Sequence, residues 1–223
     1  GSFEAATIGD VIDTINASDD IAVTASFAVN SDGSVDGTRL MLTDTSGGTG
    51  TMKVSSYGGS STATDLGIAG NDTSSAGTIT GSVIYGITKS TALSTLNDGL
   101  GVNNGTAGSI TISDSTSGLS WTINLSKCGT VASVLSAIAS QSSGSVTGAI
   151  SGDGLGIVLT GTSGSNLSVS SDTLYDTTAA DLGIACDSVG SAVNGTKLLA
   201  DMDSVQLKNL SGVGATGIIG ASG

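Results

Sequence analysis

The stretch Thr7–Ser18 has the sequence TIGDVIDTINAS, and its apolar residues recur with the period of an α-helix. Val11, Ile12 and Ile15 lie three, four and seven residues after Ile8. This spacing places four branched apolar side chains on one face of a short helix. Thr7 stands where a capping residue is expected, and Asp10 lies in the first turn, where a negative charge is favourable. The stretch therefore predicts an amphipathic helix.

After this helix the period changes from about 3.6 residues to about 2, which indicates β-strands. From Ile21 to Val29, apolar residues alternate with polar or small ones, as in a strand with one buried face. The rest of the unit follows in order: turn residues at 30–37, a strand from Leu40, a glycine-rich turn at 46–50, a strand at 52–56, and a closing segment ATDLGIA at 63–69.

The same order of segments occurs a second time. Thr130–Gln141, TVASVLSAIASQ, matches the helix at an offset of 130 − 7 = 123, with apolar residues at Val131, Val134, Leu135 and Ile138. The closing segment recurs as AADLGIA at 179–185, at an offset of 181 − 65 = 116. This repeat predicts an α+β chain of two similar modules, each a small antiparallel β-sheet with one packed helix.

A β-hairpin is expected before the second helix, with strands at Ser109–Ile112 and Trp121–Leu125. The tail resembles the region before that hairpin, because GTKLL at 195–199 is similar to ITKST at 87–91, and GVG at 212–214 to GVN at 101–103. The chain does not begin with Met, and we expect it to be part of a longer array. The predicted parts are a first module at 3–70, a linker and leader at 71–106, a second module with its hairpin at 107–187, and the leader of a further repeat at 188–223.

The charge of the chain excludes several classes of partner. With 19 acidic and 6 basic residues the formal net charge is −13. Nucleic-acid binding needs a basic surface, and an anionic membrane surface would repel this chain. No apolar run approaches the roughly 18 residues of a membrane span. We predict neither a nucleic-acid nor a membrane partner, and an exposed, acidic surface that keeps identical copies soluble.

No residue pattern predicts a catalytic or metal site. The loop Asn30–Gly37, NSDGSVDG, has oxygen ligands as in a calcium loop, but its glycine spacing does not fit an EF-hand and no Glu follows at the twelfth position. We interpret it as a hairpin turn, and Asp201 and Asp203 as solvated. The chain has no His to activate a Ser, few aromatics to stack a sugar, and no P-loop Lys near the GGTG at 47–50. We predict no catalytic residue, no cofactor and no metal.

The two cysteines occupy matched places in the second module. Cys128 precedes its helix, where the first module has Ala5, and Cys186 follows its closing segment, where the first module has Gly70. The ends of a compact module are often close together, and an exported protein meets an oxidising exterior. We predict a disulfide between Cys128 and Cys186, with two buried free thiols as the alternative.

Three segments together resemble the flagellin hook IN motif. They are Asp10–Ser18, which ends its helix with Ile15-Asn16, then VTAS at 23–26 and LTDTSGG at 42–48. The resemblance covers 7–69 and, in a weaker form, 130–185, where Ala139 replaces the Asn of the motif. The motif recurs in the outer domains of long bacterial flagellins and of the hook-associated protein 2 family, which forms the filament cap.

The resemblance implies a surface-exposed structural domain of a bacterial flagellar protein, extracellular and serving cell motility, with no catalysis. Its partners would be other copies or other subunits of the flagellar filament, contacted through core regions that this sequence does not include. The alternative is a repeat module of a large secreted adhesin or surface-layer protein. Flanking sequence separates the two, because heptad-patterned helices are expected beside a flagellar domain, and a signal peptide and anchor in an adhesin.

Overall fold

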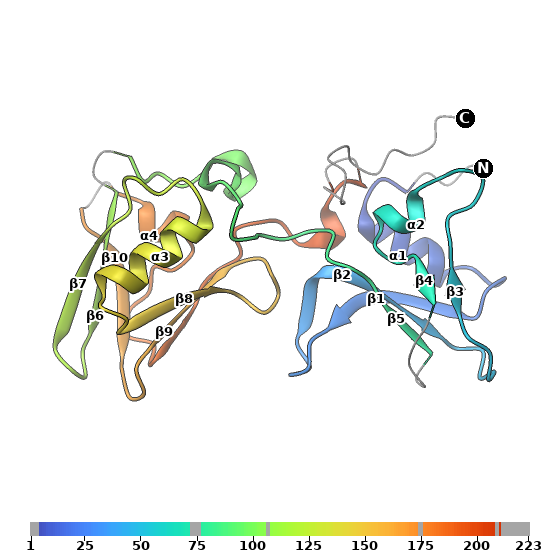
Figure 1. Ribbon diagram of the computed structural model, residues 1–223, viewed down its shortest axis with the longest axis horizontal. Coiled ribbons are helices and arrows are strands. Elements are labelled where there is room, and N and C mark those ends of the chain that lie inside the picture. Colours follow the sequence, from blue (N-terminus) through green and yellow to red (C-terminus); the bar gives the residue numbers. More distant parts are fainter. Residues whose placement is uncertain (1–4, 72–76, 106–107, 174–175, 208–209, 211–223) are drawn as a thin grey trace. The chain divides into compact units, whose positions relative to one another are not determined.

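The computed structural model describes residues 5–71, 77–105, 108–173, 176–207 and 210. The chain divides into two compact units: unit 1 comprises 1–86 and 201–223, and unit 2 comprises 87–200 (Figure 1). Both contain short helices and small antiparallel sheets, which confirms the predicted α+β class. Within the described ranges, no helix is long and apolar enough to cross a bilayer.

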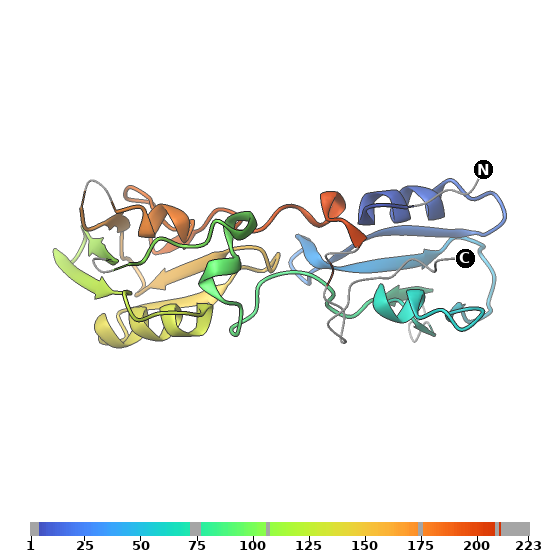
Figure 2. The same ribbon diagram turned by 90° about the horizontal axis from the view of Figure 1, so that it is seen from above.

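Unit 1 is built on the antiparallel sheet β1-β2-β5, and α1 packs on β1. Strands β3 and β4 form a second, two-stranded sheet, where a single sheet was predicted. Figure 2 shows α1 and α2 on opposite sides of the larger sheet. In chain order the elements are α1 (Ile8–Asn16), β1 (Val23–Val29), β2 (Val35–Asp44), β3 (Lys53–Val54), α2 (Thr62–Asp65), β4 (Gly70–Asn71), β5 (Thr78–Thr80) and the 3₁₀ helix η3 (Met202–Ser204).

Unit 2 has two three-stranded antiparallel sheets, β8-β9-β11 and β10-β6-β7. Helix α3 packs on β8 and also contacts β7. The predicted hairpin is present as β6–β7. The elements are the 3₁₀ helices η1 (Leu93–Thr95) and η2 (Asn97–Gly99), then β6 (Ser109–Asp114), β7 (Leu119–Asn124), α3 (Val131–Gln141), β8 (Val146–Ile150), β9 (Ile157–Gly161), β10 (Leu167–Ser171), α4 (Thr178–Asp181) and β11 (Ala192–Asn194).

Both long helices begin where the sequence predicted, because each has a capping box. Thr7 Oγ1 accepts a hydrogen bond from Asp10 N at 3.2 Å, and the Asp10 carboxylate accepts one from Thr7 N at 2.9 Å. In α3 the same exchange joins Thr130 and Ser133. These bonds satisfy backbone N–H groups that a helix leaves unpaired at its first turn.

The two units share one topology. The order β1-β2-β5 in unit 1 recurs as β8-β9-β11 in unit 2, with the long helix before the first strand in both. The central residues pair in the same register: Ala25↔Leu42↔Ile79 and Gly148↔Leu159↔Val193. The repeat detected in the sequence is therefore a repeat of strand pairing as well as of apolar pattern.

The compact units divide the chain at other places than the predicted parts. The interval 71–106 contains β5, which completes the larger sheet of unit 1, and the described tail residues 201–207 and 210 return to unit 1. Ile8 N donates to Val205 O at 3.2 Å, and Leu207 N donates to Ala6 O at 3.0 Å. Residues 212–214, which also resemble the leader, lie outside the described residues.

The tail docks on α1 as the leader of unit 2 docks on α3. Val131 N donates to Thr91 O at 3.0 Å and Leu93 N donates to Gly129 O, also at 3.0 Å. Relative to α3, these two hydrogen bonds occupy the positions that the two tail hydrogen bonds occupy relative to α1. The physical reason for the return is apolar burial, because three tail side chains join the core of unit 1: Met202, Val205 and Leu210.

Candidate functional site

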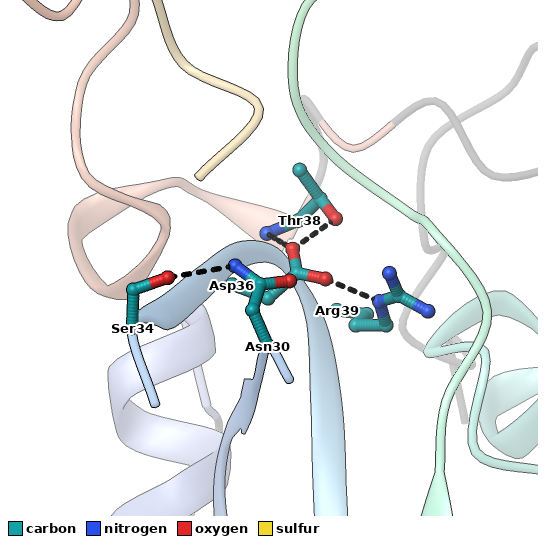
Figure 3. A network of polar contacts seen from close by, with 5 residues as sticks. All are labelled: Asn30, Ser34, Asp36, Thr38 and Arg39. Atoms are coloured by element: carbon teal, nitrogen blue, oxygen red, sulfur yellow. Dashed lines mark hydrogen bonds and ion pairs between the residues drawn. The ribbon is translucent and has the colours of Figure 1, made fainter. Parts of the chain in front are cut away.

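The loop that resembled a calcium site is a hairpin turn between β1 and β2. Asn30 N donates to Ser34 O at 2.8 Å, and Asn30 Nδ2 donates to Ser34 Oγ at 3.1 Å. Asp32 Oδ1 accepts from both Ser34 N and Ser34 Oγ, at 2.9 and 2.6 Å. These contacts lie within the turn itself, and Figure 3 draws the one between the side chains of Asn30 and Ser34. The carboxylate of Asp32 thus stabilises the turn.

Asp36, the other acidic residue of this loop, is buried near the start of β2. Its Oδ1 accepts from Thr38 N and Thr38 Oγ1, and its Oδ2 lies 2.5 Å from Arg39 Nε (Figure 3). Burial raises the pKa of Asp36, but the hydrogen bonds from Thr38 and Arg39 outweigh it, so the pKa is lowered. A carboxylate held in this way anchors the strand beside the register shift at Phe27/Ala28.

The acidic residues do not gather into a metal cage. Among the described residues, no three His, Cys, Asp or Glu side chains are close enough together to hold an ion. Asp201 and Asp203 are exposed, and Asp203 Oδ1 accepts from Ser204 N at 2.8 Å. Both flank the first residue of η3, whose side chain is buried in the core of unit 1.

The predicted disulfide between Cys128 and Cys186 is not formed, and both residues are free thiols packed against the core of unit 2. Cys186 pairs with Val169 of β10, whereas Cys128 follows β7 at the far edge of the sheet β10-β6-β7. Burial raises the pKa of the Cys186 thiol.

Unit 1 carries an apolar depression of about 320 Å³ between the start of β1 and the start of β3. Ile21, which the alternating pattern assigned to a half-buried strand, precedes β1 and is 49% exposed. At the rim, Asp44 Oδ1 accepts from Ser46 N at 2.7 Å. The lining residues are Ile21, Ala22, Val23, Asp44, Ser46, Gly50, Thr51 and Met52.

Such a surface can receive an apolar side chain or an added strand, since it joins exposed apolar atoms to the end of a short strand. Sequence reasoning did not find it, because Ile21 and Met52 read as ordinary strand residues. Comparison with known proteins adds no assignment: no family model, no curated protein and no solved structure matches the chain.

Proposed function

We propose that this chain is a surface-exposed structural domain of a bacterial flagellar protein, a flagellin, hook-associated or cap protein, without catalysis. The proposal rests on the resemblance of 7–69 to the flagellin hook IN motif. The observation that carries it is the contact of Asn16, the motif's Asn, whose side-chain amide binds both backbone groups of Ala25 in β1. The motif residue thus holds the end of α1 against β1, which is a structural role and supports a structural function.

The charge and the repeat also support this function. A net charge of −13 suits a surface displayed in many identical copies, because like charges keep such copies apart. The repeated topology suits a display domain enlarged by duplication. Its partners would be other copies or other subunits of the filament, reached through core regions outside this sequence, and its place would be outside the cell.

Immunogold electron microscopy of cells that carry the gene tests this function. An antibody raised against the chain is expected to label flagellar filaments along their length or at the tip. The matched control is the same strain without its flagellar export apparatus, where the label should disappear. Label that persists on the cell envelope of that strain would contradict the proposal and favour an adhesin or surface-layer protein.

A further inference from the structure

A segment from far along the chain completes unit 1. The tail segment, residues 201–207 and Leu210, docks on the acceptor edge, residues 6–8 at the start of α1. We propose that the tail segment is exchanged between copies, so that the tail segment of one molecule docks on the acceptor edge of a second copy of this chain. This interaction goes beyond the proposed function and does not depend on it.

The docking contact is a short antiparallel bridge. Gln206 pairs with Thr7. The neighbouring backbone groups bond on both sides of this pair, through Ile8 N at 3.2 Å and Leu207 N at 3.0 Å, which each donate to a carbonyl group of the opposite segment. The tail segment therefore binds the acceptor edge through main-chain groups, as an added strand binds the edge of a sheet.

Apolar burial strengthens the docking contact. Met202, Val205 and Leu210 are 2%, 8% and 1% exposed, and they belong to the core of unit 1 that contains the fully buried Ile8. Removal of the tail segment would expose these side chains and their neighbours to water, which is unfavourable. Unit 1 is therefore stable only with a tail segment in place, whichever molecule supplies it.

The acceptor edge is followed by a glycine that lets the tail segment approach closely. A β-carbon on Gly9 would lie 2.9 Å from Asp203 O, which is closer than a β-carbon can pack against a carbonyl oxygen. The first turn of α1 is therefore shaped for the backbone of the tail segment. A side chain at Gly9 should weaken docking without touching the paired residues.

Unit 2 makes the same docking contact with a different chain connection. Ala92 pairs with Thr130 as Gln206 pairs with Thr7, at an offset of 206 − 92 = 114 for the docked segments. Ala92 lies 130 − 92 = 38 residues before its partner, whereas Gln206 lies 206 − 7 = 199 residues after its partner. The two segments thus specify the contact, independently of the chain that joins them. A tail segment that arrives from a second copy makes identical contacts, which is the condition for exchange of an element between copies.

The docked segments also share a pair of leucines. Leu93 and Leu96 are 3% and 0% exposed, and their counterparts at the offset of 114 are Leu207, which is half-buried, and Leu210. In unit 2 this spacing of three residues places both side chains on one side of η1. Every copy of the chain therefore carries a segment of the pattern Leu-x-x-Leu that fits the acceptor edge.

The corresponding edge of α3 is closed to a second copy. The segment that docks there belongs to unit 2 and is held by further bonds within that unit. Asn97 Nδ2 donates to Asp181 O at 2.9 Å, and Asn104 Nδ2 donates to Leu125 O at 2.7 Å. Exchange is therefore expected at α1 and not at α3.

The tail segment begins where the chain crosses from one unit to the other. Unit 2 ends at Ala200, and the chain re-enters unit 1 at Asp201. Just before this crossover, Leu198 N donates to Leu155 O at 2.8 Å, which keeps the preceding residues in unit 2. A change of backbone direction at the crossover is therefore enough to send the tail segment to another molecule.

Exchange competes with docking inside one molecule. A tethered segment has an effective concentration on the order of 1 mM, so exchange is favoured where copies are crowded. The net charge of −13 opposes the approach of two copies, and salt screens this repulsion. We expect exchange to increase with protein concentration and with ionic strength.

Chains with a single cysteine test the exchange, in a background with Cys128→Ser and Cys186→Ser. One chain carries Thr7→Cys and the other Gln206→Cys, because the two residues of such a pair have Cα atoms about 4.5 Å apart, within the range of a disulfide. The chains are mixed at about 1 mM in high salt and oxidised below the unfolding transition. We expect a cross-linked dimer of the two different chains, at least about tenfold more abundant than the dimers of either chain alone.

Two matched controls locate the contact. Thr130→Cys mixed with Gln206→Cys offers the occupied edge of α3 and should give only the background of random collisions. Gly9→Ala added to the Thr7→Cys chain should reduce the cross-link several-fold. Helix α1 stays folded in that variant, because Ala favours a helix more than Gly does.

A chain with both Thr7→Cys and Gln206→Cys reports docking within one molecule. Diluted to about 1 μM, it should form the disulfide without a dimer. If it does so while the mixed chains give no cross-link, the tail segment acts only within its own molecule and the exchange is excluded. Failure of this chain to form a disulfide would exclude the docking contact itself. Equal cross-linking at Thr130→Cys, or no effect of Gly9→Ala, would place the contact elsewhere and also contradict the exchange.

Discussion

The side-chain amide of Asn16 binds the backbone of Ala25 twice: Oδ1 accepts from Ala25 N at 2.7 Å, and Nδ2 donates to Ala25 O at 3.0 Å. The pair joins the end of α1 to β1, an edge strand whose outer backbone groups would otherwise face solvent. In unit 2 the matching helix position is Ala139, and Ser142 instead binds both Val146 N and Val146 O. Each unit thus ties its helix to its first strand through one side chain, placed differently.

Replacing Asn16 should destabilise unit 1. Asn16→Ala removes both hydrogen bonds to Ala25, and we expect a loss of about 1–2 kcal/mol in the free energy of unfolding. Ser142→Ala is the matched change in unit 2, and because Ser142 is fully buried its loss should be at least as large. Denaturant unfolding with amide exchange resolved by unit measures both. If Asn16→Ala left unit 1 as stable as before, the paired hydrogen bonds would not hold the helix to the strand.

The matched helix residues Ile15 and Ile138 should differ in their contribution to stability. Ile138 is 0% exposed, and Ile138→Ala should cost about 2–5 kcal/mol of unfolding free energy. Ile15 is half-buried, so Ile15→Ala should cost roughly half as much, because less apolar surface is removed from water on folding. Chemical denaturation of the two variants gives the comparison. Equal costs would mean that the face of α1 is as well covered as that of α3.

Two glycines should resist substitution because neighbouring carbonyl groups lie where a side chain would start. A β-carbon on Gly81 would lie 2.9 Å from Leu40 O and 3.1 Å from Gly67 O, and Gly195 meets Ile157 O and Gly183 O in the same way. Gly81→Ala and Gly195→Ala should each cost about 1–3 kcal/mol through the backbone shift that they force.

Gly129 provides the control for these two variants. A β-carbon there meets no atom within 4 Å, so Gly129→Ala should change stability little. Thermal unfolding of the three variants makes the comparison. Similar melting temperatures for all three would contradict the close approach of the loops at Gly81 and Gly195.

Asp114 should make unit 2 sensitive to acid. The N–H of Asn166 and the hydroxyl of Ser117 lower the pKa of this carboxyl from 3.8 to about 2 in the folded state. A lowered pKa means that the ionised carboxylate stabilises the fold above pH 3.8, and that this contribution is lost as the pH falls from about 4 toward 2. Asp114→Asn should flatten the dependence of unit 2 stability on pH in that window, measured by denaturant unfolding at each pH. An unchanged slope would exclude Asp114 as its source.

The thiols should titrate as two free groups. In the denatured, unreduced protein, two thiol groups per chain should react with a thiol reagent, because Cys128 and Cys186 are not bonded. In the folded protein Cys186 should react slowly, since its pKa is raised by burial and the thiolate is the reactive form. Cys128→Ser identifies the slow group. If no thiol of the denatured chain reacted, the two cysteines would be joined in the predicted disulfide.

Local hydrogen bonds and periodicity were readable from the sequence. The caps at Thr7 and Thr130 depend on partners three residues away, so the helix starts followed from residue type and spacing alone. The hairpin β6–β7 is also local, because six pairs form around one turn. The repeat of 7–69 in 130–185 predicted the shared topology, because the same pattern of apolar residues buries the same faces of the helix and strands in both units.

The tertiary structure decided which distant segments meet. The sequence of the tail resembles a leader but does not say which helix it contacts. Met202 and Val205 are buried in unit 1, where the N-terminus of α1 supplies backbone partners for the tail. Cys186 pairs with Val169 of β10 whereas Cys128 follows β7 at the other edge of that sheet, and the sequence spacing of the two cysteines does not encode this strand order. The exposed Ile21 has the same cause: its strand-like pattern is local, but burial of a strand also requires a neighbouring element to cover it.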